Sequence, residues 1–174
     1  MDSRRSTCIC RFAWLLCVAT GCVRADAVAE DELKAALTYK FAQFTDWPVA
    51  PREFSFCACG RASPENLLVS LNGKTLKNMP VVVRWLLSPP EAQNCNVLFL
   101  NHPQPNQLAQ WFASIKGLPV LTVSDDPNAW DKGAMIYLSS ETNRIRFDIN
   151  VAAARSAGLN LRAQMVRLAR EIRD

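Results

Sequence analysis

The order of apolar and polar positions predicts strands that alternate with helices along most of the chain. Short runs rich in β-branched and aromatic residues, bounded by turn residues, predict strands at 54–59, 80–86, 97–100 and 119–123. Apolar residues at helical spacing predict helices at 31–44 and 108–115. This alternation is typical of a mostly parallel sheet covered on both faces. We therefore expect an α/β fold: a three-layer sandwich with a five- or six-stranded sheet and helices on both faces.

The first predicted helix has one apolar face, formed by Leu33, Ala36, Leu37, Phe41 and Phe44. Trp47-Pro48 is expected to end this helix, because proline disfavours helical geometry in the residue before it. A further helix is expected to begin at 63–65, where a serine can cap the backbone and a proline occupies the first helical position.

The C-terminal part of the chain predicts a hairpin followed by helices. Residues 134–139 and 144–149 are expected to pair as antiparallel strands. Before the hairpin, Gly133 is expected to adopt a positive φ. Within the hairpin Phe147 is expected to face the core, and after it Asn150 is expected to cap a helix.

An Ala-rich helix closed by Gly158 should follow the hairpin. After it, apolar residues at helical spacing predict an amphipathic helix that ends the chain. Its apolar stripe is Leu161, Met165, Leu168 and Ile172.

Residues 1–27 have the pattern of a cleaved signal peptide. Three arginines precede an apolar run at 12–23, and the small residues of 25–27 suit a peptidase site. The run is too short to span a bilayer as a helix. A second interpretation is that Cys22 is lipidated, since residues 19–22 loosely match a lipoprotein signal. Both interpretations predict export to the periplasm, with residues 28–174 forming one domain.

Charge excludes nucleic acid as a partner. Removing four arginines and two aspartates with residues 1–27 leaves 16 basic and 14 acidic residues, a net charge of +2. A nucleic-acid-binding protein would need a concentrated basic face. The C-terminal third is rich in arginine, which predicts either a solvated face or a contact with an acidic partner or a membrane surface. These arginines are Arg144, Arg146, Arg155, Arg162, Arg167, Arg170 and Arg173.

The sequence predicts no catalytic, cofactor or metal site. His102 is the one histidine, and no G-x-S-x-G turn presents a nucleophilic serine. Neither a dinucleotide-binding glycine pattern nor a P-loop follows any predicted strand. We expect His102 to lie at a strand end with ordinary loop hydrogen bonds.

Three cysteines remain after the signal peptide: Cys57, Cys59 and Cys95. In an oxidising compartment they allow at most one intrachain disulfide. Cys57 and Cys59 could act as a redox pair, although residues two apart on a strand lie near the distance limit for a disulfide. Alternatively, one of them bonds to Cys95 and the other is a small buried hydrophobe.

Five segments together resemble the YfiR family of exported bacterial proteins. They are K-A-A-L-x-Y-K-F-A-Q-F-T-D-W-P at 34–48, F-x-F-C-x-x-G at 54–60, C-x-V-L-F-L at 95–100, L-P-V-L-T-V-S-D at 118–125, and G-x-M-I-x-L followed by I-R-F-x-I-N at 133–150. Cys57 and Cys95 match the family's cysteine positions, so the resemblance implies a Cys57–Cys95 disulfide. It also singles out five residues as structural or partner-facing: Trp47, Pro48, Gly133, Phe147 and Asn150.

The resemblance further implies a non-enzymatic periplasmic regulator. Its expected partner is the periplasmic domain of a membrane signalling enzyme, either a diguanylate cyclase or a sensor kinase. Repression of a diguanylate cyclase would lower cyclic di-GMP. An outer-membrane protein is a further candidate partner, and a homodimer is expected. Two other function classes remain open. One is a small-ligand sensor with a binding crevice at the carboxyl ends of the strands. The other is a thiol oxidoreductase that uses Cys57 and Cys59.

Overall fold

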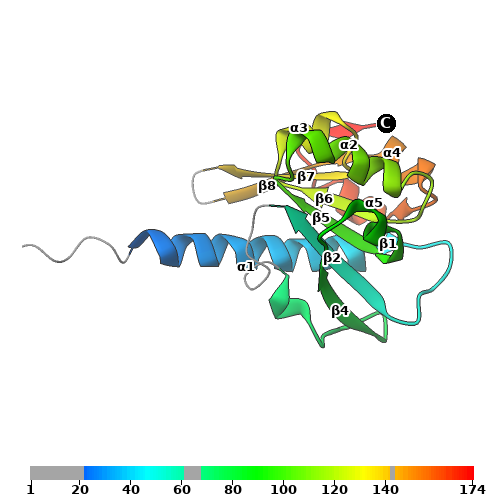
Figure 1. Ribbon diagram of the computed structural model, residues 1–174, viewed down its shortest axis with the longest axis horizontal. Coiled ribbons are helices and arrows are strands. Elements are labelled where there is room, and N and C mark those ends of the chain that lie inside the picture. Colours follow the sequence, from blue (N-terminus) through cyan, green and yellow to red (C-terminus); the bar gives the residue numbers. More distant parts are fainter. Residues whose placement is uncertain (1–21, 61–67, 142–143) are drawn as a thin grey trace, which may run out of the picture.

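The computed structural model describes residues 22–60, 68–141 and 144–174, with side chains from residue 28 onward. An eight-stranded sheet runs through the molecule in the order β10-β8-β7-β6-β5-β2-β4-β3 (Figure 1). Its strands are β2 (Phe54–Gly60), β3 (Thr75–Leu76), β4 (Met79–Trp85), β5 (Val97–Asn101), β6 (Leu121–Ser124), β7 (Ile136–Glu141), β8 (Arg144–Asn150) and β10 (Ile172–Arg173). A separate two-stranded sheet pairs β1 (Thr45–Asp46) with β9 (Asn160–Leu161).

The sheet is mainly parallel, as predicted. Strands β4, β2, β5, β6 and β7 run parallel, and β8 returns antiparallel to β7 as the expected hairpin. The strand count exceeds the predicted five or six because β3 and β10 add two-residue pairings at the edges. Pairings this short leave no periodic pattern in a sequence.

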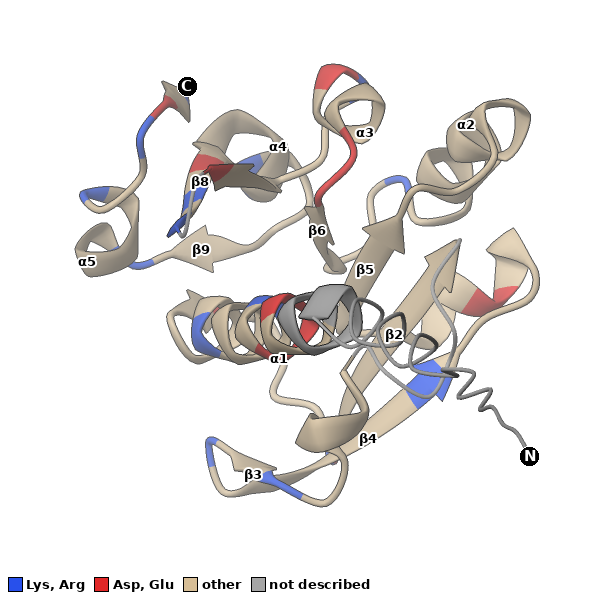
Figure 2. Ribbon diagram, turned by 90° about the vertical axis from the view of Figure 1, so that its left-hand side faces the viewer, with Lys and Arg blue, Asp and Glu red and all other residues tan. Residues whose placement is uncertain are grey.

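Helices cover both faces of the sheet, which confirms the three-layer α/β sandwich (Figure 2). The helices are α1 (Cys22–Gln43), α2 (Pro105–Ser114), α3 (Pro127–Asp131), α4 (Val151–Ser156) and α5 (Ala163–Val166), with 3-10 helices η1 (Val69–Leu71) and η2 (Pro89–Asn94). Helices α1, α4 and α5 contribute to one core, and α2, α3 and η2 contribute to the other.

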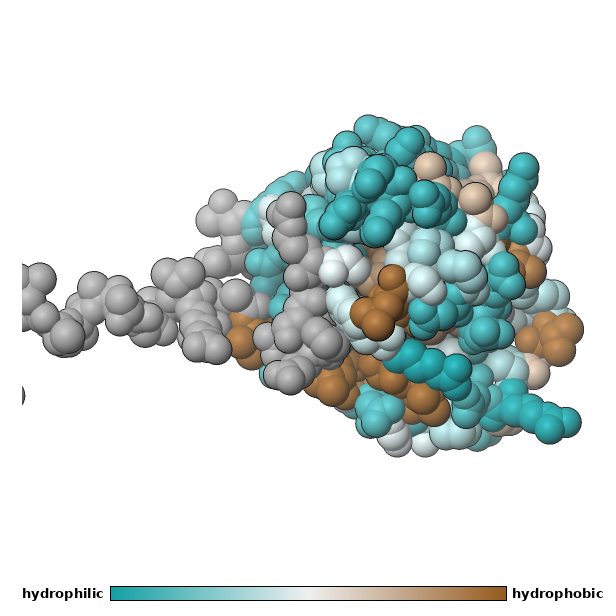
Figure 3. Space-filling view, in the orientation of Figure 1, coloured by the Kyte–Doolittle hydropathy of each residue, from teal (hydrophilic) through white to brown (hydrophobic). Residues whose placement is uncertain are grey.

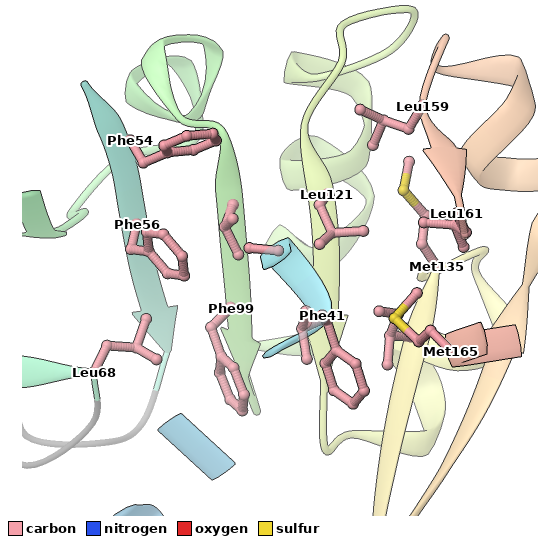
Figure 4. Close-up of a cluster of buried hydrophobic side chains, with 14 of the residues drawn as sticks. Phe41, Phe54, Phe56, Leu68, Phe99, Leu121, Met135, Leu159, Leu161 and Met165 are labelled. Carbon is pink, nitrogen blue, oxygen red and sulfur yellow. The ribbon is translucent and has the colours of Figure 1, made fainter. Parts of the chain in front are cut away.

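Alternation along the central strands divides their side chains between the two cores. Phe56 of β2 and Phe99 of β5 belong to the core under α1, where Figure 4 shows them among the side chains that surround Phe41. Cys57 and Leu98, the neighbours in sequence, belong to the core under α2. Strands buried on both faces are apolar at most positions, here with Ser55, Thr122 and Ser124 as buried polar exceptions, so predominantly apolar runs predicted them correctly.

Helix α1 is longer than predicted and is rotated relative to the predicted apolar face. It begins at Cys22, so its first turns fall within the predicted signal peptide. Its buried side includes Lys34, Thr38 and Phe41, whereas Leu33 is 47% exposed. The expectation that Leu33 faces the core was therefore wrong, because two polar residues on the buried side have partners there. Figure 1 shows the N-terminal half of α1 projecting beyond the sheet.

The predicted end of the first helix at Phe44 is confirmed to within one residue, although the helix ends before it reaches Trp47-Pro48. Helix α1 ends at Gln43, and the next residues pair with β9. Trp47 is instead packed: its Nε1 donates to the carbonyl of Pro119 at 2.9 Å, and its ring lies edge-on to Phe54 at 5.2 Å. Pro48 is exposed.

The predicted C-terminal helix is not formed. The four-residue α5 is followed by an extended segment, and Leu168 of the expected apolar stripe is 74% exposed. Arg170 explains the difference, because its guanidinium bonds both carboxylate oxygens of buried Asp148 at 3.0 and 2.6 Å. This pair holds the last residues against β8, where the amide of Ile149 donates to the carbonyl of Glu171.

Other local predictions can be compared directly with the structure. Gly133 has φ +102°, as expected, and Asn150 caps α4 by accepting a 2.9 Å hydrogen bond from the amide of Ala153. The first hairpin strand begins and ends two residues later than predicted, at Ile136 and Glu141, whereas the second begins at Arg144 as predicted and runs one residue further, to Asn150. The helix start expected at 63–65 lies outside the described residues.

Candidate functional site

A disulfide joins Cys57 of the central strand β2 to Cys95, which follows η2. The Cα atoms are 6.0 Å apart and the cysteines are separated by 38 positions in the chain. Both residues are buried, Cys57 completely and Cys95 with 5% exposed. The pairing implied by the family resemblance is confirmed, and the bond anchors the connection between β4 and β5 to the centre of the sheet.

Cys59 is a free cysteine in the same core as the disulfide. Burial raises its pKa to about 12, so the thiol stays protonated at neutral pH. Because a thiolate is the reactive form of cysteine, Cys59 is unsuited to attack a disulfide. The structure supports its interpretation as a small buried hydrophobe, and Cys57 is already bonded to Cys95.

An ion-pair network links α1 to the end of β6. The amine of Lys34, an 8% exposed residue, lies 2.8 Å from Asp125 Oδ2 and 2.7 Å from Glu30 Oε1. Burial by itself lowers the pKa of Lys34, but its hydrogen bonds with Asp125 and Glu30 raise it by more. The hydrogen bond from Lys34 also lowers the pKa of Glu30. This network explains how a lysine occupies the buried side of the helix.

His102 lies at the end of β5, as expected, beside the same network. Its Nε2 is 3.6 Å from Asp125 Oδ1, and its Nδ1 is 3.9 Å from Asp126 Oδ2. Both distances exceed a hydrogen bond. Asp126 accepts instead from the amide of Asn128 at 2.9 Å and so caps α3. The hydroxyl of Ser124 donates to the carbonyl of Leu100 at 2.6 Å and accepts from the amide of Asp126 at 3.0 Å, so its hydrogen bonds are made to the backbone around this loop.

Most arginines of the C-terminal third are paired with acids of this chain. Carboxylate partners lie within 4.0 Å of five of them: Arg146, Arg155, Arg162, Arg170 and Arg173. Arg162 and Lys77 both bond Asp46, and their hydrogen bonds lower its pKa to about 2. The basic character of this region is therefore largely neutralised inside the fold, which weakens the interpretation of a basic contact surface.

An apolar ridge follows the exposed side of α1. We call Leu33, Ala36 and Leu37 together the α1 ridge; Leu33 is 47% exposed and Ala36 is also exposed. Figure 3 shows apolar surface gathered on this side of the molecule, below the projecting helix.

Two hollows flank the α1 ridge. One, of about 310 Å³, has an apolar floor that includes Leu37 and Leu71 and is bordered by Lys40 and Lys74. The other, of about 520 Å³, lies between α1 and the β7–β8 hairpin. Leu33 borders both hollows.

Within the described part of the chain, no group of three or more histidine, cysteine, aspartate or glutamate side chains is placed to hold a metal ion. Over the same residues, no helix has the length and apolar character needed to cross a membrane.

The model of the YfiR/HmsC-like family matches residues 31–170. The chain belongs to the YfiR/HmsC-like family. The match runs from α1 to the segment that follows α5, and so includes the disulfide and the Arg170–Asp148 pair. Membership of this family is consistent with a regulatory role in the periplasm.

Among solved structures, the fold is similar to that of a conserved domain protein from Vibrio cholerae O1 biovar eltor str. N16961. The TM-score is 0.54 at 11% sequence identity, and the likeness covers 82% of this chain. This chain spans 60% of the length of that protein. At this identity the comparison concerns the fold alone.

The structure does not bring the five residues singled out by family resemblance into one site. Trp47 packs against Phe54, and Phe147 lies 5.0 Å from the Phe41 ring in an edge-on contact. Gly133 and Asn150 act in a turn and a helix cap. Pro48 is exposed, and a partner-facing role for it stays a prediction.

Sequence reasoning missed the α1 ridge and the Lys34 network. The signal for both was one lysine inside an otherwise apolar helical pattern. Such a residue indicates either a break in the buried face or a buried ion pair, and its partner, Asp125, is 91 positions away.

Proposed function

We propose that this protein is a non-enzymatic regulator that binds the periplasmic domain of a membrane signalling enzyme and holds it inactive. The enzyme class we favour is a diguanylate cyclase, so binding lowers cyclic di-GMP. Family membership over residues 31–170 supports regulation rather than catalysis. The disulfide, buried between the sheet and η2, supports a location of the protein in an oxidising compartment.

The observation that carries this proposal is the α1 ridge. An exposed apolar helix face beside an apolar hollow marks an interaction surface more often than a solvated one. Lys40 and Lys74 border the hollow, and neither forms an ion pair with an acid in the described part of the chain. We infer that the occupant is an amphipathic helix of the partner, with apolar residues against Leu37 and acidic residues beside the two lysines.

The mechanism is sequestration of one conformational state. A regulator shifts its partner's equilibrium only by the difference between its affinities for the inactive and active states. Converting an equal mixture to a ratio of 99:1 requires about 100-fold tighter binding to the inactive state, or roughly 2.7 kcal/mol. A few well-packed apolar anchors can supply this difference, since large aliphatic side chains contribute about 1.5–3 kcal/mol each when fully buried.

Photo-crosslinking tests this proposal in cells. A photoreactive phenylalanine analogue replaces Ala36 on the α1 ridge, and the matched control carries it at Leu168, an exposed apolar residue on a different element. We expect a crosslinked product only from position 36, formed with a membrane protein that carries a cyclase domain and lost when Leu33→Glu is added. Crosslinking of equal strength from both positions, or to no membrane signalling enzyme, would show that the ridge is not the contact.

A further inference from the structure

A third hollow lies at the opposite layer of the fold, where β2, β4 and β5 end. Strand β2 comes first in this set; the chain moves to β4 on one side of it and then returns to β5 on the other. Connections that leave neighbouring parallel strands in opposite directions open a crevice at the strands' carboxyl ends, which is where ligands bind in open α/β sheets. Here that position holds a cavity of about 380 Å³, a volume within the range of small-molecule sites.

The floor of the cavity is backbone rather than side chain. Gly60, the last residue of β2, has φ +114°, and a Cβ atom there would lie 1.8 Å from the carbonyl oxygen of Asn101. Only glycine fits, because β2 and β5 approach each other closely at this point. His102, the residue after Asn101, has φ +43° and borders the cavity.

Trp111 of α2 lines the cavity and carries an unused hydrogen-bond donor. The residue is 3% exposed, and its indole Nε1 has no partner among the described residues. Trp47, by contrast, donates its Nε1 hydrogen to a carbonyl at 2.9 Å. A buried donor without an acceptor costs about 1–3 kcal/mol, so such groups are rare and point to an acceptor that binds from outside.

The electrostatic character of the cavity favours an anion. The N-terminus of the ten-residue α2 borders it through Gln104 and Pro105, and the start of a helix carries partial positive charge. Among the described residues that line it, none is a carboxylate and His102 is the one ionisable side chain.

The carboxylates of Asp125 and Asp126 lie beside His102, within 4.0 Å of its ring nitrogens. Asp125 is paired with Lys34, and Asp126 caps α3. Trp85, Leu86 and Leu87 form an apolar wall of the cavity, and Gln104 and Gln107 add polar surface.

We propose that this cavity binds a small organic carboxylate with an apolar, ring-sized body. The carboxylate accepts the indole hydrogen of Trp111 and lies at the start of α2, and the ring packs against Trp85 and Leu86. The site is formed by the layer that carries α2, whereas the α1 ridge belongs to the other layer. This inference goes beyond the proposed partner binding and does not depend on it.

Fluorine NMR with 4-fluorobenzoate and 4-fluorophenylacetate as probes tests the site on the purified exported domain. We expect the probe signals to broaden at millimolar concentration, and the indole N–H resonance that Trp111→Phe removes to shift on titration. 4-Fluorotoluene, which has the ring but no acceptor, should not broaden. Trp111→Phe should weaken carboxylate binding about tenfold or more, as expected for a hydrogen bond to a charged group.

A surface variant keeps the test independent of folding. Gln107 borders the cavity and is exposed, so Gln107→Glu places a negative charge at its mouth without altering the core. The matched control is Gln110→Glu, the same change on an exposed residue of α2 that does not border the cavity. We expect weaker probe binding for Gln107→Glu alone. Absence of broadening with both carboxylates, or equal binding by wild type and both Gln107→Glu and Trp111→Phe, would overturn the proposal.

Discussion

Removing the disulfide should be the most destabilising simple change to this fold. The double variant Cys57→Ala/Cys95→Ala opens a loop that the bond closes across 38 positions. In the chain-entropy description, closing a loop of this length stabilises the folded state by about 4 kcal/mol. Truncating two buried cysteines adds a packing loss of roughly 1 kcal/mol for each side chain.

Cys59→Ala provides the matched control, because Cys59 is equally buried in the same core but has no bond. Urea unfolding followed by circular dichroism gives the free energy of unfolding for each variant. We expect the double variant to lose about 4–6 kcal/mol and Cys59→Ala to lose about 1 kcal/mol. The urea dependence should also steepen in the double variant, since its unfolded chain exposes more surface. A loss no greater than twice that of Cys59→Ala would show that the bond itself adds nothing.

Three further changes have defined outcomes in urea unfolding. Gly60→Ala should destabilise the fold by at least about 2 kcal/mol more than Gly73→Ala. Both glycines have a positive φ, but only at Gly60 would a Cβ atom collide with the backbone of a neighbouring strand. Equal losses would contradict the close approach of β2 and β5 at Gly60. Arg170→Ala should lower the free energy of unfolding by about 3 kcal/mol, because it leaves the buried carboxylate of Asp148 without its ion-pair partner. The control Arg167→Ala, at an exposed position, should lower it by at most about 0.5 kcal/mol. Equal losses in the two variants would refute the stabilising role of the Arg170–Asp148 pair. The pKa of Asp46 is lowered from 3.8 to about 2, so its ion pairs stabilise the fold above about pH 4, and this stabilisation is lost as the pH falls through 2. Asp46→Asn should therefore reduce the fall in unfolding free energy between pH 4 and pH 2. An unchanged fall would show that the Asp46 ion pairs do not contribute to stability.

The central sheet could be predicted because the amino-acid composition of its strands indicates that they are buried. Residues 54–59, apart from Ser55, and residues 97–100 are apolar on both faces, as expected for strands covered on both sides. The disulfide could be predicted because family resemblance supplied the pairing that three cysteines alone left open.

The errors came from contacts between residues far apart in the chain. The spacing of Leu161, Met165 and Leu168 fits a long helix, but only the short α5 forms, because the Arg170–Asp148 pair holds the residues that follow it against β8. The buried side of α1 depends on an acid 91 positions away. Local patterns cannot register such partners, and for the same reason neither the α1 ridge nor the cavity at Trp111 could be located before the chain was folded.

The cellular level of cyclic di-GMP tests the central claim most directly. The gene is deleted, and the strain is complemented with wild type, with Leu33→Glu on the α1 ridge, or with Leu168→Glu as the matched exposed control. Immunoblots of the periplasmic fraction confirm equal amounts of each variant. We predict that deletion raises cyclic di-GMP, that wild type and Leu168→Glu restore the low level, and that Leu33→Glu does not. An unchanged level on deletion, in a strain whose cyclases are expressed, would contradict the proposed function, and full repression by Leu33→Glu would contradict the α1 ridge as the contact surface.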